Sequence, residues 1–187
     1  QLPDNKYRVT GYTFKNWLGA SGIYANGGAF AANTDDTLYA QWTNEKYTFR
    51  TEYYLMDTDG KYPVSSNLTN TFSAAFGAEI SVSSASIQIS RTGMSLDLSH
   101  PDTIKIDGSG RVLHVYYKRD TYKIAYSYTL PDSTEKTVSY DTYYYGQPVT
   151  AQAKPEVNGY TFVGWIFGES GTAPDTMPNK DISATGT

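Results

Sequence analysis

Cysteine is absent from this chain of 187 residues. Without thiols there is no disulfide framework, no thiolate nucleophile and no cysteine-ligated zinc or iron–sulfur centre. No apolar run approaches the ~20 residues that a membrane-spanning helix needs, so no membrane insertion is expected in this segment. Neither sign of charge predominates strongly, because the chain has 15 Lys and Arg and 19 Asp and Glu. The resulting net charge of −4 gives no basic footprint for nucleic acid.

Long helical patterns are also missing. Eight prolines interrupt the chain, at positions 3, 63, 101, 131, 148, 155, 174 and 178, and each one breaks a helix that runs through it. Single helical turns are expected at most, around Ser73–Phe76 and Ser83–Ile87.

What the chain does contain is aromatic residues, including 18 Tyr, 7 Phe and 3 Trp. Alternating β-branched and aromatic residues predict strands over Tyr47–Tyr54, Leu113–Tyr117 and Tyr122–Tyr128. Turn sequences flank them at Asp57–Gly60 and Asp107–Gly110, whose Asp-Gly pairs favour tight hairpin turns. The sequence predicts a mainly β or α+β fold.

The chain resembles itself at two separations. Gly11–Trp17 and Gly159–Trp165 share the pattern Gly-Tyr-Thr-Phe-x-x-Trp at a separation of 148 residues. A shift of 75 residues aligns a further set of similar side chains: Leu38 with Leu113, Trp42 with Tyr117, Tyr47 with Tyr122, Tyr53 with Tyr128 and Asp57 with Asp132. Two shorter correspondences join them, Phe76–Ile80 with Tyr145–Val149, and Gly93–Leu96 with the Gly-Tyr-Thr-Phe segments. A tandem array of small modules is predicted.

The expected module boundaries follow from these shifts. Residues 1–45 form the back part of a first module, 46–120 a diverged middle module without the tryptophan, and 121–187 a third module. Asp181–Thr187 takes the place of Asp36–Trp42, so the third module is expected to stop inside or just after its last strand. Modules of ~60–75 residues bury little surface, and large aromatic side chains compensate for this. The residues expected to form the small cores are Gly11, Tyr12, Phe14, Trp17, Trp42, Gly159, Tyr160, Phe162 and Trp165.

These motifs resemble a known family. Gly-Tyr-Thr-Phe-x-x-Trp at Gly11–Trp17, followed by Thr37–Trp42, is similar to the internalin-type B-repeat, also called the Listeria–Bacteroides repeat. The segment that begins at Tyr53–Tyr62 and ends at Val112–Arg119 looks like a variant near the mucin-binding-protein-type repeats. The resemblance implies ubiquitin-like β-grasp modules in tandem, in secreted or wall-anchored proteins of bacteria, Gram-positive ones in particular. It implies no catalytic motif.

Candidate chemistry is thin. His114 takes the place of Tyr39 within a strand, and His100 has no second histidine near enough in sequence to form a metal pair. Asp57–Gly60 reads as a turn or as an irregular calcium site, although Leu68 stands where an EF-hand needs glutamate. No Gly-x-Ser-x-Gly segment supplies a nucleophile elbow. No catalytic residue, cofactor or metal site is therefore expected, and the protein is not expected to be an enzyme.

The run Tyr143-Tyr144-Tyr145 is the candidate ligand-binding patch. In a strand, Tyr143 and Tyr145 would face one side and Tyr144 the other. Two interpretations stay open: a cross-strand or inter-module contact, or a surface that binds a ligand or partner.

Two functions follow. The first, which the resemblance implies, is a non-catalytic stalk or spacer of a bacterial cell-surface or secreted, adhesin-like protein. Only four residues separate Trp42 from Tyr47 and Tyr117 from Tyr122, and such short joints favour a semi-rigid array. The alternative is an adhesive module that binds an extracellular glycan or a host or bacterial surface protein through surface tyrosines.

Overall fold

The computed structural model describes residues 1–31, 35–134 and 136–187. Within these residues the chain is almost entirely β, with no α-helix and one 3₁₀ turn at Ala85–Ile87. The prediction of a mainly β fold is confirmed. Of the two expected helical turns, the one near Ser83–Ile87 is present, whereas Ser73 lies in strand β5 (Leu68–Ala75).

The chain divides into two compact units. The first contains Gln1–Glu52, Thr69–Ile87 and Pro101–His114, and the second contains Tyr53–Leu68, Gln88–His100 and Val115–Thr187. The boundary therefore falls within strands β4 (Lys46–Leu55) and β9 (Arg111–Arg119). The division into three modules at 1–45, 46–120 and 121–187 stays a prediction.

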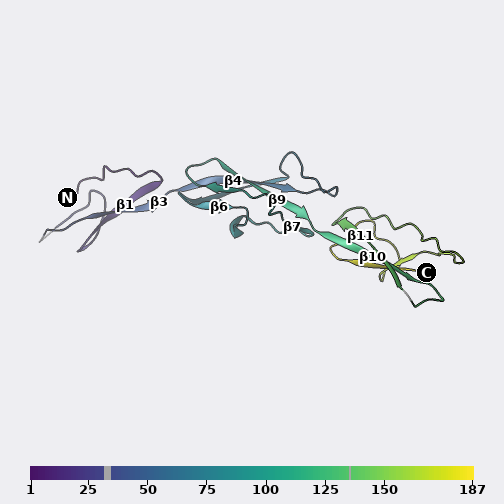
Figure 1. Ribbon diagram of the computed structural model, residues 1–187. Coiled ribbons are helices and arrows are strands. Elements are labelled where there is room, and N and C mark those ends of the chain that lie inside the picture. The colour runs from purple at the N-terminus through teal and green to yellow at the C-terminus, as the bar shows by residue number, and fades with distance from the viewer. Residues whose placement is uncertain (32–34, 135) are drawn as a thin grey trace. The chain divides into compact units, whose positions relative to one another are not determined.

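Near the N-terminus, three strands form an antiparallel sheet in the order β2-β1-β3 (Figure 1). Strand β1 (Tyr12–Gly19) pairs with β2 (Gly22–Tyr24) and with β3 (Tyr39–Asn44), and the β1–β3 register shifts between Phe14 and Asn16. Half-buried and exposed side chains alternate along β1, and the alternation shifts just after the irregularity in register.

Four strands of the middle segment form a sheet in the order β5-β4-β9-β7, where β7 is Met94–Leu96. Strands β6 (Glu79–Ser81) and β8 (Thr103–Lys105) form a separate antiparallel pair. Alternate residues of β4 and β9 are buried, which is why both strands read as period two in the sequence. The buried hydrophobic residues of the two strands are Phe49, Tyr53, Leu113, Val115 and Tyr117.

The C-terminal sheet has the order β11-β10-β13-β12 (Figure 1). Strand β10 (Thr121–Thr129) pairs antiparallel with β11 (Lys136–Tyr144) and parallel with β13 (Ile182–Gly186). Strand β12 (Trp165–Phe167) pairs antiparallel with β13. The buried hydrophobic cluster of this sheet contains Ile124, Tyr126, Phe167, Met177 and Ala184.

The two Asp-Gly segments lie outside strands, but the tight hairpins predicted for them are wrong. Residues 56–67 separate β4 from β5, and Asp107–Gly110 connects β8 to β9, which are not paired with each other. Asp57 stabilises its own turn, because its carboxylate accepts hydrogen bonds from the N–H groups of Asp59 and Lys61, both at 2.9 Å.

Candidate functional site

Two single residues connect consecutive strands at equivalent positions. Glu45 is the only residue between β3 and β4, and Asp120 is the only residue between β9 and β10. They are the same distance apart, 75 residues, as the aligned side chains of the sequence repeat. Each lies within one compact unit together with all of the contacts described for it below.

The backbone of both linker residues is fully engaged. The N–H of Glu45 donates to the carbonyl of Gly11 (2.8 Å), and its carbonyl accepts from the N–H of Phe76 (2.8 Å). In the same way, the N–H of Asp120 donates to Gly93 (2.9 Å), and its carbonyl accepts from Tyr145 (2.9 Å). A linker whose donor and acceptor are both used has little freedom to rotate.

The linker carboxylates are hydrogen-bonded as well. The Thr13 hydroxyl donates to Glu45 at 3.2 Å, and the Ser95 hydroxyl donates to Asp120 at 2.5 Å. The Tyr47 hydroxyl also donates to Glu45, and this hydrogen bond to a carboxylate raises the pKa of the phenol. An acidic side chain is suited to the position, because it accepts hydrogen bonds without donating any.

The side chain of the residue before each linker donates to an equivalent backbone carbonyl, that of the aromatic residue at the junction. Asn44 donates through Nδ2 to the carbonyl of Phe76 (3.3 Å), and Arg119 donates through Nη1 to the carbonyl of Tyr145 (2.7 Å). Arg119 also donates through Nε to the carbonyl of Met56 (3.0 Å). The guanidinium therefore joins two segments at the second linker, where the asparagine at the first contacts one.

A glycine turn receives the aromatic ring at each linker. Gly11 and Gly93 have φ values of +80° and +66°, and each occupies the third position of a turn closed by an N–H donor one residue later. This is the geometry of a type II turn, which favours glycine. The ring of Phe76 covers Gly11 and the ring of Tyr145 covers Gly93, so closely that a Cβ on either glycine would overlap ring atoms. We call this set of contacts, centred on Glu45 or Asp120, an aromatic–glycine junction.

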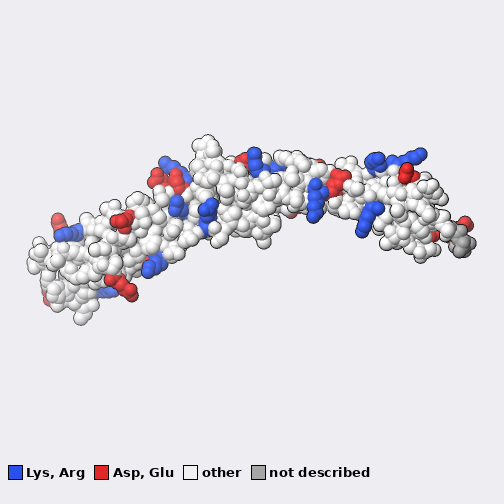
Figure 2. All heavy atoms as spheres, turned by 180° about the vertical axis from the view of Figure 1, so that it is seen from behind, with Lys and Arg blue, Asp and Glu red and all other residues white. Residues whose placement is uncertain are grey.

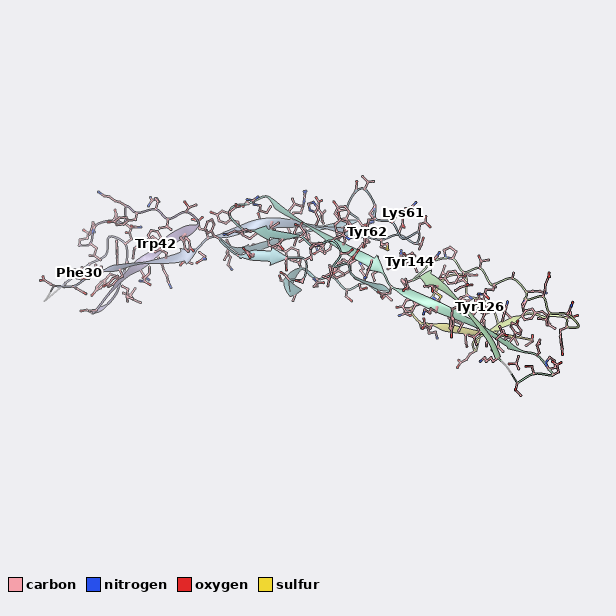
Figure 3. All side chains as sticks on the ribbon, viewed as in Figure 1. Phe30, Trp42, Lys61, Tyr62, Tyr126 and Tyr144 are labelled. Atoms are coloured by element: carbon pink, nitrogen blue, oxygen red, sulfur yellow. The ribbon has the colours of Figure 1, made fainter. Side chains whose placement is uncertain are left out.

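The tyrosine run is half-buried, and its three members contact different segments. Tyr143 packs against the buried cluster of the C-terminal sheet and donates to the carbonyl of Thr150 (2.7 Å), and burial raises its pKa. Tyr144 lies against Gly60, where a Cβ would come within 2.8 Å of its ring. Figure 3 labels Tyr144 together with Lys61 and Tyr62, which follow Gly60 in the chain. Strand β11 ends at Tyr144, so Tyr145 lies in the following turn and the expected alternation of faces stops there. Binding of an external ligand by these tyrosines stays a prediction.

The predicted core aromatic residues are packed together but only half-buried. Phe14 lies 5.1 Å from Trp17 and 5.6 Å from Trp42 between ring centroids, and Phe162 lies 4.8 Å from Trp165. None of the three tryptophans belongs to the fully buried set. Thin three- and four-stranded sheets leave one side of a large ring accessible, and Trp165 packs against the buried cluster of the C-terminal sheet. The expectation that these residues form the small cores stays a prediction.

Two further motif residues lie at the surface. Tyr160 is 40% exposed, and Gly159 is exposed beside it. Tyr12, the counterpart of Tyr160, is half-buried because it meets the Phe76 ring edge-on at 5.8 Å. The same motif thus occupies two different environments in the chain.

Sequence patterns gave no indication of a buried carboxylate at Asp97. Asp97 is 6% exposed and accepts hydrogen bonds from Tyr62 (2.7 Å) and from the N–H and hydroxyl of Ser99 (3.0 and 2.7 Å). Burial works against ionisation, but these hydrogen bonds prevail and hold the pKa of Asp97 well below its ordinary value. Tyr62 lies 35 positions before Asp97, and Ser99 belongs to no recognisable motif. No spacing in the sequence therefore indicates the cluster.

The Asp97 cluster lacks the geometry of a catalytic triad. The Ser99 hydroxyl and the Asp97 carboxylate both contact Nδ1 of His100, at 3.2 and 3.0 Å. In a triad the serine and the aspartate contact opposite ring nitrogens, so that a proton passes through the imidazole. The His100 ring instead stacks on Tyr116, with centroids 4.4 Å apart, which indicates a packing role.

His114 lies in β9, as its alignment with a strand residue predicts. Its backbone N–H and its Nδ1 contact the Asp102 carboxylate at 2.9 and 3.2 Å. Among the described residues, no group of three or more His, Cys, Asp or Glu side chains is arranged to hold a metal ion.

Charged side chains of both signs are interspersed over the face seen in Figure 2. No helix in the described part of the chain is both long and apolar enough to cross a membrane.

The recurring geometry at the linkers is thus the most distinctive feature of the chain. A scan against models of known protein families finds no match, and a search of curated proteins finds none either.

Proposed function

We propose that this chain is a non-catalytic stalk or spacer region of a bacterial cell-surface or secreted, adhesin-like protein. In this proposal its parts at 1–45, 46–120 and 121–187 are tandem β-grasp-like modules. The observation that carries the proposal is the recurrence of the aromatic–glycine junction at Glu45 and at Asp120, with the same backbone donors and acceptors. A binding protein or an enzyme has no evident need for two matched junctions, whereas a spacer depends on them.

The junction supports stiffness through three physical effects. The linker is one residue long, its N–H and C=O groups are both hydrogen-bonded, and an aromatic ring packs on a backbone that has no side chain. Each effect removes rotational freedom at the point where a flexible array would bend. Stability is then shared between each module and its junctions, as in other repeat arrays.

The extracellular, wall-anchored or secreted location, in a Gram-positive bacterium, comes from the resemblance to the internalin-type B-repeat. The absence of cysteine agrees with stabilisation by packing. The shared contact of Ser99 and Asp97 with one nitrogen of His100 supports a role without catalysis.

An insertion experiment tests the proposal. Four Gly-Ser residues inserted after Asp120 break the second junction, and the same four inserted after the exposed Val64 serve as the control. ¹⁵N relaxation of residues 121–187 reports whether this part tumbles with the rest of the chain. We expect joint tumbling in the unaltered chain and in the control, and independent tumbling after the Asp120 insertion. Independent tumbling in the unaltered chain would contradict a stalk.

The adhesive alternative has one observation in its favour. Tyr140 is 63% exposed on β11, which is an edge strand of the C-terminal sheet, and Val138 is exposed on the same strand. Exposed aromatic rings are common in binding surfaces. A glycan array and a pull-down with the whole chain test this. Specific binding that is lost in Tyr140→Ala or Tyr144→Ala would favour the adhesive module.

A further inference from the structure

A third glycine turn of the same kind occurs at Gly159. Gly159 has a φ of +84°, and the N–H of Tyr160 donates to the carbonyl of Val157 at 3.1 Å. The matching distances at Tyr12 and Met94 are 3.0 and 3.2 Å. The backbone has therefore built the turn that receives an aromatic ring at the two junctions.

The third turn has no ring on it. No heavy atom of the described residues lies within 4 Å of a Cβ placed on Gly159, apart from its immediate chain neighbours. The same test on Gly11 and Gly93 finds the rings of Phe76 and Tyr145. Tyr160 is correspondingly more exposed than Tyr12, which the Phe76 ring contacts.

A hollow of about 230 Å³ lies beside the turn. It is lined mainly by apolar side chains, among them those of Leu130, Pro131, Val157, Tyr160 and Phe162. An apolar cavity of ~150 Å³ is large enough to hold a benzene ring. The hollow therefore has room for an aromatic side chain that approaches the turn.

The residues around the turn also match the junctions. Thr161 follows Gly159 by two positions and is exposed, as Thr13 follows Gly11 and Ser95 follows Gly93, and those two hydroxyls bind the linker carboxylates. Under the 75-residue shift, Pro131 takes the place of Met56, whose carbonyl accepts from Arg119 at the second junction. The glycine, the hydroxyl group and the apolar residues of the hollow are thus all present beside the third turn.

We propose that the surface formed by Gly159, Tyr160, Thr161 and the adjoining hollow is a docking surface for a further module of the same kind. The partner presents an acidic residue in extended backbone, which binds Gly159 and Thr161, and an aromatic residue followed by glycine, whose ring covers Gly159. Phe76-Gly77 and Tyr145-Gly146 are the two examples in this chain. The inference rests on the proposed spacer function and names the partner of its free surface.

An extended chain tests the docking surface. The sequence comparison aligns Thr187 with Trp42, but the strand register shifts this by one residue. Trp165 pairs with Gly186 as Trp17 pairs with Ala40, so Thr187 corresponds to Gln41, and a second copy of residues 42–119 is appended directly after it. Amide hydrogen exchange is measured at the appended copies of Glu45 and Phe76. We expect both amides to exchange at least tenfold more slowly than in a matched chain whose appended copy carries Phe76→Ala.

Two outcomes would overturn the inference. One is a folded appended copy whose Glu45 and Phe76 amides exchange as fast as in the Phe76→Ala version. The other is an appended copy that stays unfolded, because the same residues fold where Gly11 provides the docking turn. Hydrogen exchange at the amides of Asp120 and Tyr145, measured in the same sample, distinguishes failure of this inference from failure of the proposed spacer function. If they are protected, the internal junctions stand and only the third surface fails; if they are not, the spacer proposal fails.

Discussion

The ring of Tyr145 covers the α-carbon of Gly93 so closely that the chain has no room for a methyl group there. Phe76 and Gly11 have the same relationship. In both cases the aromatic ring packs on a glycine in a type II turn. The acidic linker residue connects the two, because its N–H donates to the carbonyl of the glycine and its carbonyl accepts from the N–H of the aromatic residue.

Gly93→Ala should therefore cost more stability than Gly159→Ala. Both substitutions place a side chain at positive φ, at a cost of ~1–2 kcal/mol. Only the first also collides with a ring, which adds ~1–3 kcal/mol of overpacking. Urea unfolding of the two variants measures the difference, and equal losses would show that the Tyr145 contact carries no stability.

The backbone of Asp120 should matter more than its side chain. Asp120→Ala removes the Ser95 hydrogen bond but keeps the N–H that donates to Gly93, and should cost ~0.5–1.5 kcal/mol. Asp120→Pro removes this N–H too, and should cost at least ~1 kcal/mol more. Thermal unfolding compares the two variants. A proline variant as stable as the alanine variant would speak against the backbone contact.

Asp97 should make the folded chain sensitive to acid. Its pKa in the folded chain lies below the ordinary value of 3.8, so its contribution to stability is complete above about pH 5. This contribution is lost as the pH falls through 3.8 towards the folded pKa. The urea midpoint of the unaltered chain should therefore fall between pH 5 and pH 3, and Asp97→Asn should reduce the fall. Asp107→Asn is the control, since Asp107 pairs with Arg111 at the exposed surface and should change the slope less. Equal slopes in all three proteins would contradict the assignment.

Trp165→Ala should unfold the C-terminal sheet selectively. Trp165 contacts Tyr126 (5.0 Å between centroids) and Phe162, and its Nε1 donates to the carbonyl of Gln152 (3.1 Å). Replacing a large aromatic residue costs ~3–5 kcal/mol when it is fully buried, and the half-buried position puts this case at the lower end. Segment-resolved hydrogen exchange should show faster exchange in β10–β13, with β4 and β5 largely unchanged. Loss of all strands in one cooperative step would count against modular stability.

Three strands, β4, β9 and β10, could be predicted from alternation alone. Tyr47–Tyr54 and Tyr122–Tyr128 lie within β4 and β10, because each strand buries one face against neighbours and this face must be apolar. The depth of the tryptophans could not be predicted, since it depends on how many strands cover each ring. The Asp97 cluster was also out of reach, because it joins Tyr62 to a residue 35 positions later with no periodic signal.

The junctions lie between these cases. The 75-residue shift already aligns Glu45 with Asp120, and a glycine followed two positions later by Thr or Ser marks each turn. That signal was present in the sequence. Its meaning required the backbone hydrogen bonds, which depend on where Phe76 and Tyr145 return to the linker after intervening segments of different length.

The parallel pairing of β10 with β13 has a mechanical consequence. The chain enters this sheet at Thr121, the start of β10, and leaves it at Gly186, the end of β13. The two strands are neighbours and run in the same direction, paired over Ile124–Ser127 and Ile182–Thr185. A pull on the two ends therefore drags these strands past each other along their length, and loads the hydrogen bonds between them together instead of peeling them off singly. Such an arrangement resists extension until several bonds break at once, which is the property that a tether under hydrodynamic drag requires.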